Sequence, residues 1–535
     1  MRRTITVLTA FTLAVVTAGA SGPAVPAKPN DATILHVLNR LGFGARPGDV
    51  ARVREIGLAN YIDRQLRPAQ VDDKVLAARL TKFETVDLSS RRIAEDYYLP
   101  VQQARQQARR QAGSDPAMAA MEGKPDGRPQ RSPEQMELAR KGRTVMQELS
   151  EQKILRAAYS ERQLEEVMTD FWFNHFNVFA GKGMTQQYVT EYEREAIRPR
   201  ALGKFRDLLG ATAKSPAMLF YLDNWQSADP DAETRRAQMR RGPGFMFPGR
   251  TPIPMPPGQQ PQQQRQRRGL NENYGRELME LHTLGVEGGY TQDDVVNVAR
   301  AFTGWTIDQP RQGGGFRFEP RMHDDKEKIV LGQKIRGGGG QGDGERVLDI
   351  LAEHPATAKF IATKLARRFV ADTPPPALVD RAAAAFRETH GDIREVVRLI
   401  VTSPEFFSAE AMRAKVKTPF EFVVSAIRAT GSDVQSAEPL TQSIRQLGMP
   451  LYMCQPPTGY ADRADAWVNT GALLNRMNFA LQLVGGRMRG VTAGDGQVST
   501  VLGPLSANTT ATVAKATEPR QVTALVLGSP EFQRR

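Results

Sequence analysis

Apolar residues recur at helical spacing along most of this chain, and no alternation of strands with helices interrupts the pattern. Side chains three and four positions apart share one face of a helix, so this spacing produces amphipathic helices that pack on one another. Helix starts are marked as well: Thr418, Pro419 and Glu421 combine an N-cap, a first-turn proline and a capping-box carboxylate. The sequence therefore predicts a mainly α fold, a large multi-helix bundle.

One short region departs from the helical pattern. Residues 316–318 and 328–331 have the composition of two strands, and His323, Asp324 and Asp325 lie between them. We expect one small β-hairpin near residues 316–331, with these three polar side chains at its turn.

The N-terminus has the composition of a secretory signal. Arg2 and Arg3 precede an apolar run at 5–16, and small residues at 18–20 provide a cleavage pattern. We expect a signal peptide at 1–20, export to the periplasm or the extracellular space, and a single helical unit at 21–535. No later apolar run reaches about 18 residues, which predicts no stable membrane span.

The positive charge of the chain is concentrated in one stretch. Of the formal net charge of +13, residues 233–268 contribute eight arginines and one glutamate, a net +7, among prolines, glycines and glutamines. Such composition does not bury a core, so low-complexity inserts are expected near 104–143 and 233–268. A basic linker without a folded basic face argues against nucleic acid as a partner and leaves an anionic envelope polymer as a candidate.

Residues 271–285 carry the first candidate site. On a helix with 100° between residues, Asn273, Arg276, Glu277 and Glu280 share one polar arc, whereas His282 lies on the far side. Two carboxylates one turn apart raise one pKa, which suits acid–base catalysis by Glu277 and Glu280, with Asn273 and Arg276 as binding residues. The structural alternative is that Arg276 neutralises Glu280 within an ion-pair network.

Two histidines extend this hypothesis. His175 follows Met168, Phe171 and Trp172 at helical spacing, which favours either a catalytic imidazole or a hydrogen-bonded core residue. His323 and Asp324 on one turn are candidate ligands of a divalent metal, and the alternative is a turn in which aspartate bonds its own backbone.

Trp305 and Asn224 are candidate binding residues. The alternatives are that the tryptophan is a core residue, which the sequence favours, and that the asparagine terminates a helix. No Gly-x-Ser-x-Gly elbow and no His-Glu-x-x-His pair occurs, so the commonest hydrolase and zinc-protease signatures are absent.

Several segments, in order, resemble the domain-of-unknown-function 1800 family. They are His-Val-Leu-Asn-Arg-Leu-Gly-Phe-Gly at 36–44, Asp-Phe-Trp-Phe-Asn-His-Phe-Asn at 170–177, the string at 271–285, Ala-Phe-Thr-Gly-Trp at 301–305 and Ser-Pro-Glu-Phe-Gln at 529–533. Tyr460 stands where the family usually has tryptophan. The resemblance implies a helical fold, export and an exported partner of the domain-of-unknown-function 1501 family, which is similar to sulfatases and alkaline phosphatases. It implies no reaction.

Two functions follow from these observations. The first is an exported scaffold or binding protein of the envelope that works with a partner. The alternative is a metal-assisted hydrolase or another enzyme that uses Glu277, Glu280, His175 and the His323–Asp324 pair in one cleft.

Overall fold

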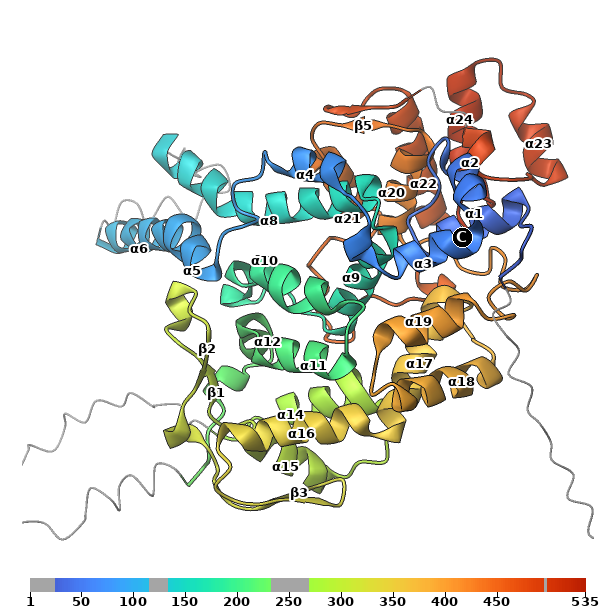
Figure 1. The fold of residues 1–535 in the computed structure, drawn as a ribbon. Helices are drawn as coiled ribbons and strands as arrows, with labels where there is room; N and C mark the ends of the chain where they lie inside the picture. The colour runs from blue at the N-terminus through green and yellow to red at the C-terminus, as the bar shows by residue number, and fades with distance from the viewer. Residues whose placement is uncertain (1–24, 115–132, 232–268, 495–497) are drawn as a thin grey trace, which may run out of the picture.

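A computed structural model describes residues 25–114, 133–231, 269–494 and 498–535 (Figure 1). Helices dominate these segments, which confirms the predicted mainly α class. The N-terminal half contains α1 (Asp31–Arg40), α2 (Asp49–Ile56), α3 (Leu58–Gln65), α4 (Lys74–Leu80), α5 (Ser90–Ile93), α6 (Leu99–Ser114), α8 (Pro133–Tyr159), α9 (Gln163–His175), α10 (Val189–Glu191), α11 (Phe205–Lys214) and α12 (Pro216–Tyr221).

The C-terminal half continues the helical architecture. Its helices are α14 (Glu272–Met279), the π-helix η7 (Glu280–Leu284), α15 (Gln292–Ala301), α16 (Gln341–Glu353), α17 (Pro355–Phe369), α18 (Pro376–Glu388), α19 (Ile393–Val401), α20 (Pro419–Ala429), α21 (Glu438–Gln446), α22 (Thr470–Val484), α23 (Ala507–Val513) and α24 (Pro519–Gly528).

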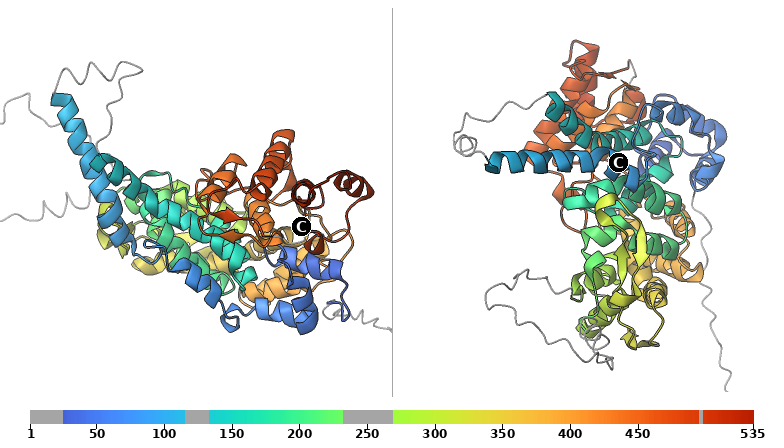
Figure 2. Two further views of the ribbon diagram at one scale, coloured as in Figure 1. Left: turned by 90° about the horizontal axis from the view of Figure 1, so that it is seen from above. Right: turned by 90° about the vertical axis from the view of Figure 1, so that its left-hand side faces the viewer.

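One cluster of buried apolar side chains runs through the molecule, with members from Ile34 to Phe532. Segments far apart in sequence meet around it: the C-terminus lies beside α1, and α14 to α16 occupy the end opposite α23 and α24 (Figures 1 and 2). A helix that is apolar on one stripe buries that stripe by packing on its neighbours, as α17 does between α18 and η7.

Within the described residues the strands form three small antiparallel pairs, and the predicted pairing of 316–318 with 328–331 is wrong. Phe316–Phe318 (β2) pairs with a strand that precedes it in the sequence, Trp305–Ile307 (β1). Lys328–Val330 (β3) pairs with the strand that follows it, Gln333–Ile335 (β4). Leu331 and Gly332 both have positive φ, which provides the two-residue turn that closes β3 on β4. The third pair joins Asp433–Val434 (β5) to Val491–Thr492 (β6).

The predicted inserts are only partly within the described residues. Residues 104–114 and 133–143 belong to α6 and α8, which extend together from the body of the molecule (Figure 2). The insert at 233–268 and the signal peptide at 1–20 lie outside the described residues. Among the helices that are described, none combines the length and the apolar character needed to cross a membrane.

Candidate functional site

His175, at the end of α9, lies at the centre of a buried polar group. Its side chain is only 2% exposed, and its Nδ1 accepts a hydrogen bond of 2.8 Å from the Lys364 amine on α17. Its Nε2 lies 3.1 Å from the backbone carbonyl of His282, to which the ring donates. A neutral imidazole with one donor and one acceptor nitrogen satisfies both contacts.

Burial sets the charges in this group. Burial and the Lys364 amine lower the pKa of His175 well below its ordinary value, and burial lowers the pKa of His282 to about 3. Burial also lowers the pKa of Lys364 to about 8, although this side chain is partly exposed. The site therefore holds two uncharged imidazoles and an amine that is partly unprotonated near neutral pH.

The π-helix η7 places His282 against α9. Its widened turn is marked by Thr283 Oγ1, which donates to the carbonyl of Leu278 five residues earlier. The His282 ring lies 6.4 Å from the His175 ring and 5.2 Å from Phe176, and its Nε2 is buried without a hydrogen-bond partner among the described residues. Short π-helical turns recur at functional positions, where they reposition a side chain.

The polar arc of α14 lies apart from this group. Glu277 is half-buried, and burial together with Glu280 raises its pKa. Glu280 accepts a hydrogen bond of 2.9 Å from the Tyr290 hydroxyl, and the exposed Arg276 donates to Gln292. Asn273 is exposed. Within the described part of the chain, no hydrogen bond or ion pair joins either glutamate to His175 or His282.

The predicted metal ligands are engaged within the fold. The His323 imidazole contacts Thr303 through Nδ1 and lies 3.2 Å from Asp343 through Nε2, and all three side chains are buried. Asp324 pairs with Arg300 at 2.8 Å and accepts from the backbone N–H of Lys326. In the described ranges, no three His, Cys, Asp or Glu side chains are placed to hold a metal ion. Metal binding at His323 and Asp324 stays a prediction.

Asn224 and Trp305 are also in the interior. Asn224 is fully buried, and its amide donates to the backbone carbonyls of Phe302 and Trp305. The Trp305 ring packs edge-on against Phe302 and Phe316. Both residues therefore have clear packing roles, and a role in ligand binding stays a prediction.

A loop after α21 covers the end of α9. Asn174 makes two hydrogen bonds with the backbone of Tyr460, and Asn177 donates to the carbonyls of Cys454 and Pro456. Gly459 lies so close that a Cβ there would be 2.2 Å from the Asn174 carbonyl oxygen. The asparagines that flank His175 thus fix this loop over the histidine site.

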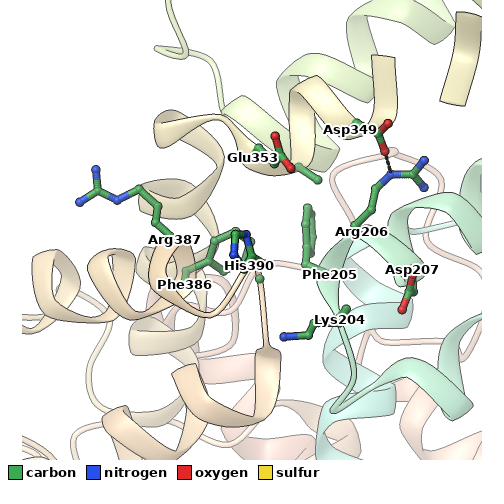
Figure 3. Close-up of a pocket in the computed structure, with 11 residues that line it drawn as sticks. Lys204, Phe205, Arg206, Asp207, Asp349, Glu353, Phe386, Arg387 and His390 are labelled. Atoms are coloured by element: carbon green, nitrogen blue, oxygen red, sulfur yellow. Dashed lines mark hydrogen bonds and ion pairs between the residues drawn. The ribbon is translucent and has the colours of Figure 1, made fainter. Parts of the chain in front are cut away.

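A cavity of about 580 Å³ opens between α11, α16 and α18. Figure 3 shows the Phe205 ring at its centre, with Glu353 above, Lys204 below and His390 to one side. Phe386 completes the aromatic wall, 5.6 Å from Phe205.

The cavity and the histidine site are separated by one layer of rings. The Phe205 centroid lies 6.3 Å from Phe176, and the Phe176 centroid lies 4.5 Å from His175. The aromatic wall of the cavity therefore packs, through Phe176, on the buried imidazole.

Sequence reasoning missed Lys364, His282 as the partner of His175, and the cavity. A signal for Lys364 existed, because it shares a helical face with Ile361 and Leu365 on α17, and a charged residue at a core position is informative. The cavity is formed by three helices distant in sequence, so no local pattern indicates it.

Comparison with known proteins identifies a family. The model of a family described as "Protein of unknown function (DUF1800)" matches residues 36–534. No curated protein and no solved structure matches the chain.

Proposed function

This chain belongs to the DUF1800 family of proteins of unknown function, and on that premise we propose that it is exported and serves as a ligand-binding protein of the cell envelope. The cavity between α11, α16 and α18 carries the proposal. Its volume of about 580 Å³ lies within the range of about 300–1,000 Å³ that holds small molecules.

The lining of the cavity indicates the kind of ligand. Phe205 and Phe386 offer an apolar wall, while Lys204, Glu353 and His390 provide charged or ionisable groups at its edge (Figure 3). Arg206 is already paired with Asp349 at 2.7 Å and with Glu345. An amphipathic small molecule with an apolar body suits this combination.

Binding of 1-anilinonaphthalene-8-sulfonate, an aromatic anion, tests the proposal. We expect one saturable site, and Ala352→Trp, which fills the cavity from its wall, weakens binding on the order of tenfold. The matched control is Ala384→Trp on α18, outside the lining. Equal affinities for the two variants and the parent protein contradict a ligand site in this cavity.

Export is tested by the N-terminus of the protein recovered from its source cells. We expect the mature chain in the periplasm or medium to begin after Ala20, because residues 1–20 have the charged, apolar and small-residue regions of a signal. Recovery of an uncleaved cytoplasmic chain contradicts export.

The second candidate function is catalysis, and the Lys364 amine favours it. An amine whose pKa is about 8 has an unprotonated fraction at neutral pH, and such an amine attacks carbonyl carbon to form an imine with loss of water. Trapping with benzaldehyde and cyanoborohydride at pH 7 should modify Lys364 at least about tenfold faster than the exposed Lys359 on the same helix. Equal labelling of the two lysines removes this candidate.

The metal-assisted form of this candidate is tested by metal analysis. It requires a stoichiometric divalent metal in the purified mature protein and its loss in Glu277→Gln. Metal-free protein whose melting is unchanged by a chelator excludes this form.

An exported partner of the domain-of-unknown-function 1501 family needs an apolar surface to bind, and α22 offers one. Leu473, Leu474 and Leu481 are 44%, 61% and 53% exposed on this helix. We expect Leu474→Glu to abolish co-purification with such a partner, whereas Gln482→Glu on the same helix leaves it intact. Recovery of the parent protein only as a free monomer contradicts the partner.

An anionic envelope polymer is the remaining partner proposal. It rests on the net +7 of residues 233–268, which lie outside the described residues. Binding to such a polymer should weaken steeply with added salt.

A further inference from the structure

Arg40, at the end of α1, is a buried charge without a counterion in contact. Its side chain is fully buried, and Nη2 donates to the backbone carbonyl of Ala411 at 2.6 Å. Its Nε and Nη1 have no hydrogen-bond partner among the described residues. A guanidinium keeps its charge and carries five N–H donors, so burial in this state is strongly unfavourable unless an acceptor is supplied.

Two further guanidinium groups lie beside Arg40. Arg368 of α17 and Arg535 are 5% and 3% exposed, and they contact Glu421 at 2.5 Å and 3.1 Å. Arg368 leaves Nε and Nη2 without a hydrogen-bond partner in the described part of the chain. In Arg535, Nε is the atom that contacts Glu421, and Nη2 has no hydrogen-bond partner there and lies 4.0 Å from Asp462. Burial and the repulsion of Arg535 lower the pKa of Arg40, as expected where three cations share one carboxylate.

His36 adds a fourth unpartnered group. It lies one turn before Arg40 on α1, its Nε2 contacts the carbonyl of Phe406, and its Nδ1 is buried without a partner among the described residues. Its Nε2 donates to that carbonyl, so Nδ1 of the neutral ring is an acceptor. Figure 1 places the C-terminus next to α1, so the guanidinium groups of Arg40 and Arg535 come together from opposite ends of the chain.

The charges of this cluster do not cancel. Two further carboxylates, those of Asp372 and Asp462, are paired with Lys415 at 2.5 Å and 2.9 Å. The four cations Arg40, Arg368, Lys415 and Arg535 outnumber the three side-chain carboxylates beside them, which are Glu421, Asp372 and Asp462. Asp170, which also faces Arg368, is paired with Lys153. Arg476 and Lys417, which also interact with Glu421, add two further cations and no carboxylate.

We propose that a small monovalent inorganic anion of the chloride class binds between Arg40, Arg368 and Arg535. One such ion lowers the excess of positive charge, accepts from several N–H groups at once and suits a site whose three guanidinium side chains are each at least nine-tenths buried. The ion joins α1, α17 and the C-terminal segment, so its binding stabilises the folded state.

Bromide provides a direct test. Crystals of the full chain grown with bromide in place of chloride should show an anomalous scattering peak within hydrogen-bonding distance of Arg40. Density of a water molecule there, without anomalous signal, overturns the proposal.

A solution experiment tests the same site independently. At constant ionic strength, replacing gluconate by chloride should raise the melting temperature of the parent protein with saturation, because chloride binds the folded state alone. Arg40→Met, which keeps the apolar stem and removes the charge, should melt at the same temperature in both salts. Arg54→Met, on the exposed face of α2, should keep the chloride response of the parent.

Each outcome decides the matter. A parent protein that melts identically in both salts and gives no anomalous peak overturns the proposal, and so does an Arg40→Met variant that keeps the full chloride response. If Arg40→Met does not fold, the bromide peak in the parent protein decides by itself.

Discussion

The charge of Lys364 faces a buried imidazole rather than a carboxylate, and its titration should therefore affect stability at alkaline pH. Its pKa falls from an ordinary 10.5 to about 8 in the fold, so between these values the unfolded chain binds more protons than the folded one. Stability then rises with pH across this window, by up to about 1.4 kcal/mol per pH unit.

Urea unfolding at pH 7.5 and pH 9.5 measures this contribution. Lys364→Met should reduce the rise, whereas Lys359→Met on the exposed face of α17 should retain it. The comparison between variants is needed because Lys417, whose pKa burial lowers to about 7, contributes in the same direction. An identical rise in the Lys364→Met variant contradicts the assignment.

Asp343 is the counterion of the buried Lys328 amine beside His323. Its carboxylate accepts from the buried Lys328 amine at 2.7 Å and faces His323 at 3.2 Å. Asp343→Asn leaves the lysine charge without a counterion, so we expect a loss of about 3–5 kcal/mol in the free energy of unfolding. Asp231→Asn, which breaks an exposed pair with Lys326, should cost less than about 1 kcal/mol in the same denaturant titration.

The position of a side chain could be predicted from the sequence where the geometry of a single helix determines which residues share a face. The placement of His282 opposite Glu277 and Glu280 on the 271–285 helix depends only on local geometry, and His282 is buried while both glutamates are partly exposed. The contact of His175 with Lys364 joins residues 189 positions apart, so it depends on packing that no local pattern contains.

Among the elements, the loop that covers α9 depends on Gly459. Its φ is +72°, and an added Cβ would lie 2.2 Å from the Asn174 carbonyl oxygen. Gly459→Ala should cost more than the roughly 1–3 kcal/mol of backbone strain alone, because the loop must also move away from Asn174. Gly448→Ala is the matched control, since its φ is +93° and no atom lies within 4 Å of the added carbon.

Chemical denaturation measures both glycine variants. Equal losses of stability would show that the contact with Asn174 contributes nothing and that positive φ alone is responsible.

Element boundaries followed from the sequence better than element pairing did. The capping box of Thr418 and Glu421 starts α20 as predicted, because a cap involves only residues three positions apart. The strands near 316 and 328 were also located correctly, but each pairs with a different neighbour, since the turn at Leu331 and Gly332 provides a shorter connection.

At the scale of the whole molecule, buried histidines should make the fold sensitive to mild acid. Burial lowers the pKa of His36 and of His282 to about 3, and that of His175 well below its ordinary value of 6.5. Below pH 6.5 the unfolded chain takes up protons that the folded chain excludes, so stability falls as pH decreases. Each histidine contributes about 1.4 kcal/mol per pH unit, as many as three protons in all.

The buried carboxylate of Glu421 affects stability in a separate, lower pH range. Its neighbours Arg368 and Arg535 lower its pKa from 4.5 to about 2, so its contribution is lost only as pH falls through that range. Urea unfolding at pH 7, 6 and 5 therefore excludes Glu421, and a comparison of variants separates the histidines from Lys417, whose pKa is about 7. The double variant His36→Gln with His282→Gln should reduce the slope of the free energy of unfolding against pH by the equivalent of about two protons. His390→Gln, at an exposed position beside the cavity, should leave this slope unchanged. Stability that stays constant from pH 7 to pH 5 would mean that water or a ligand reaches these imidazoles in the folded protein and lets them ionise there.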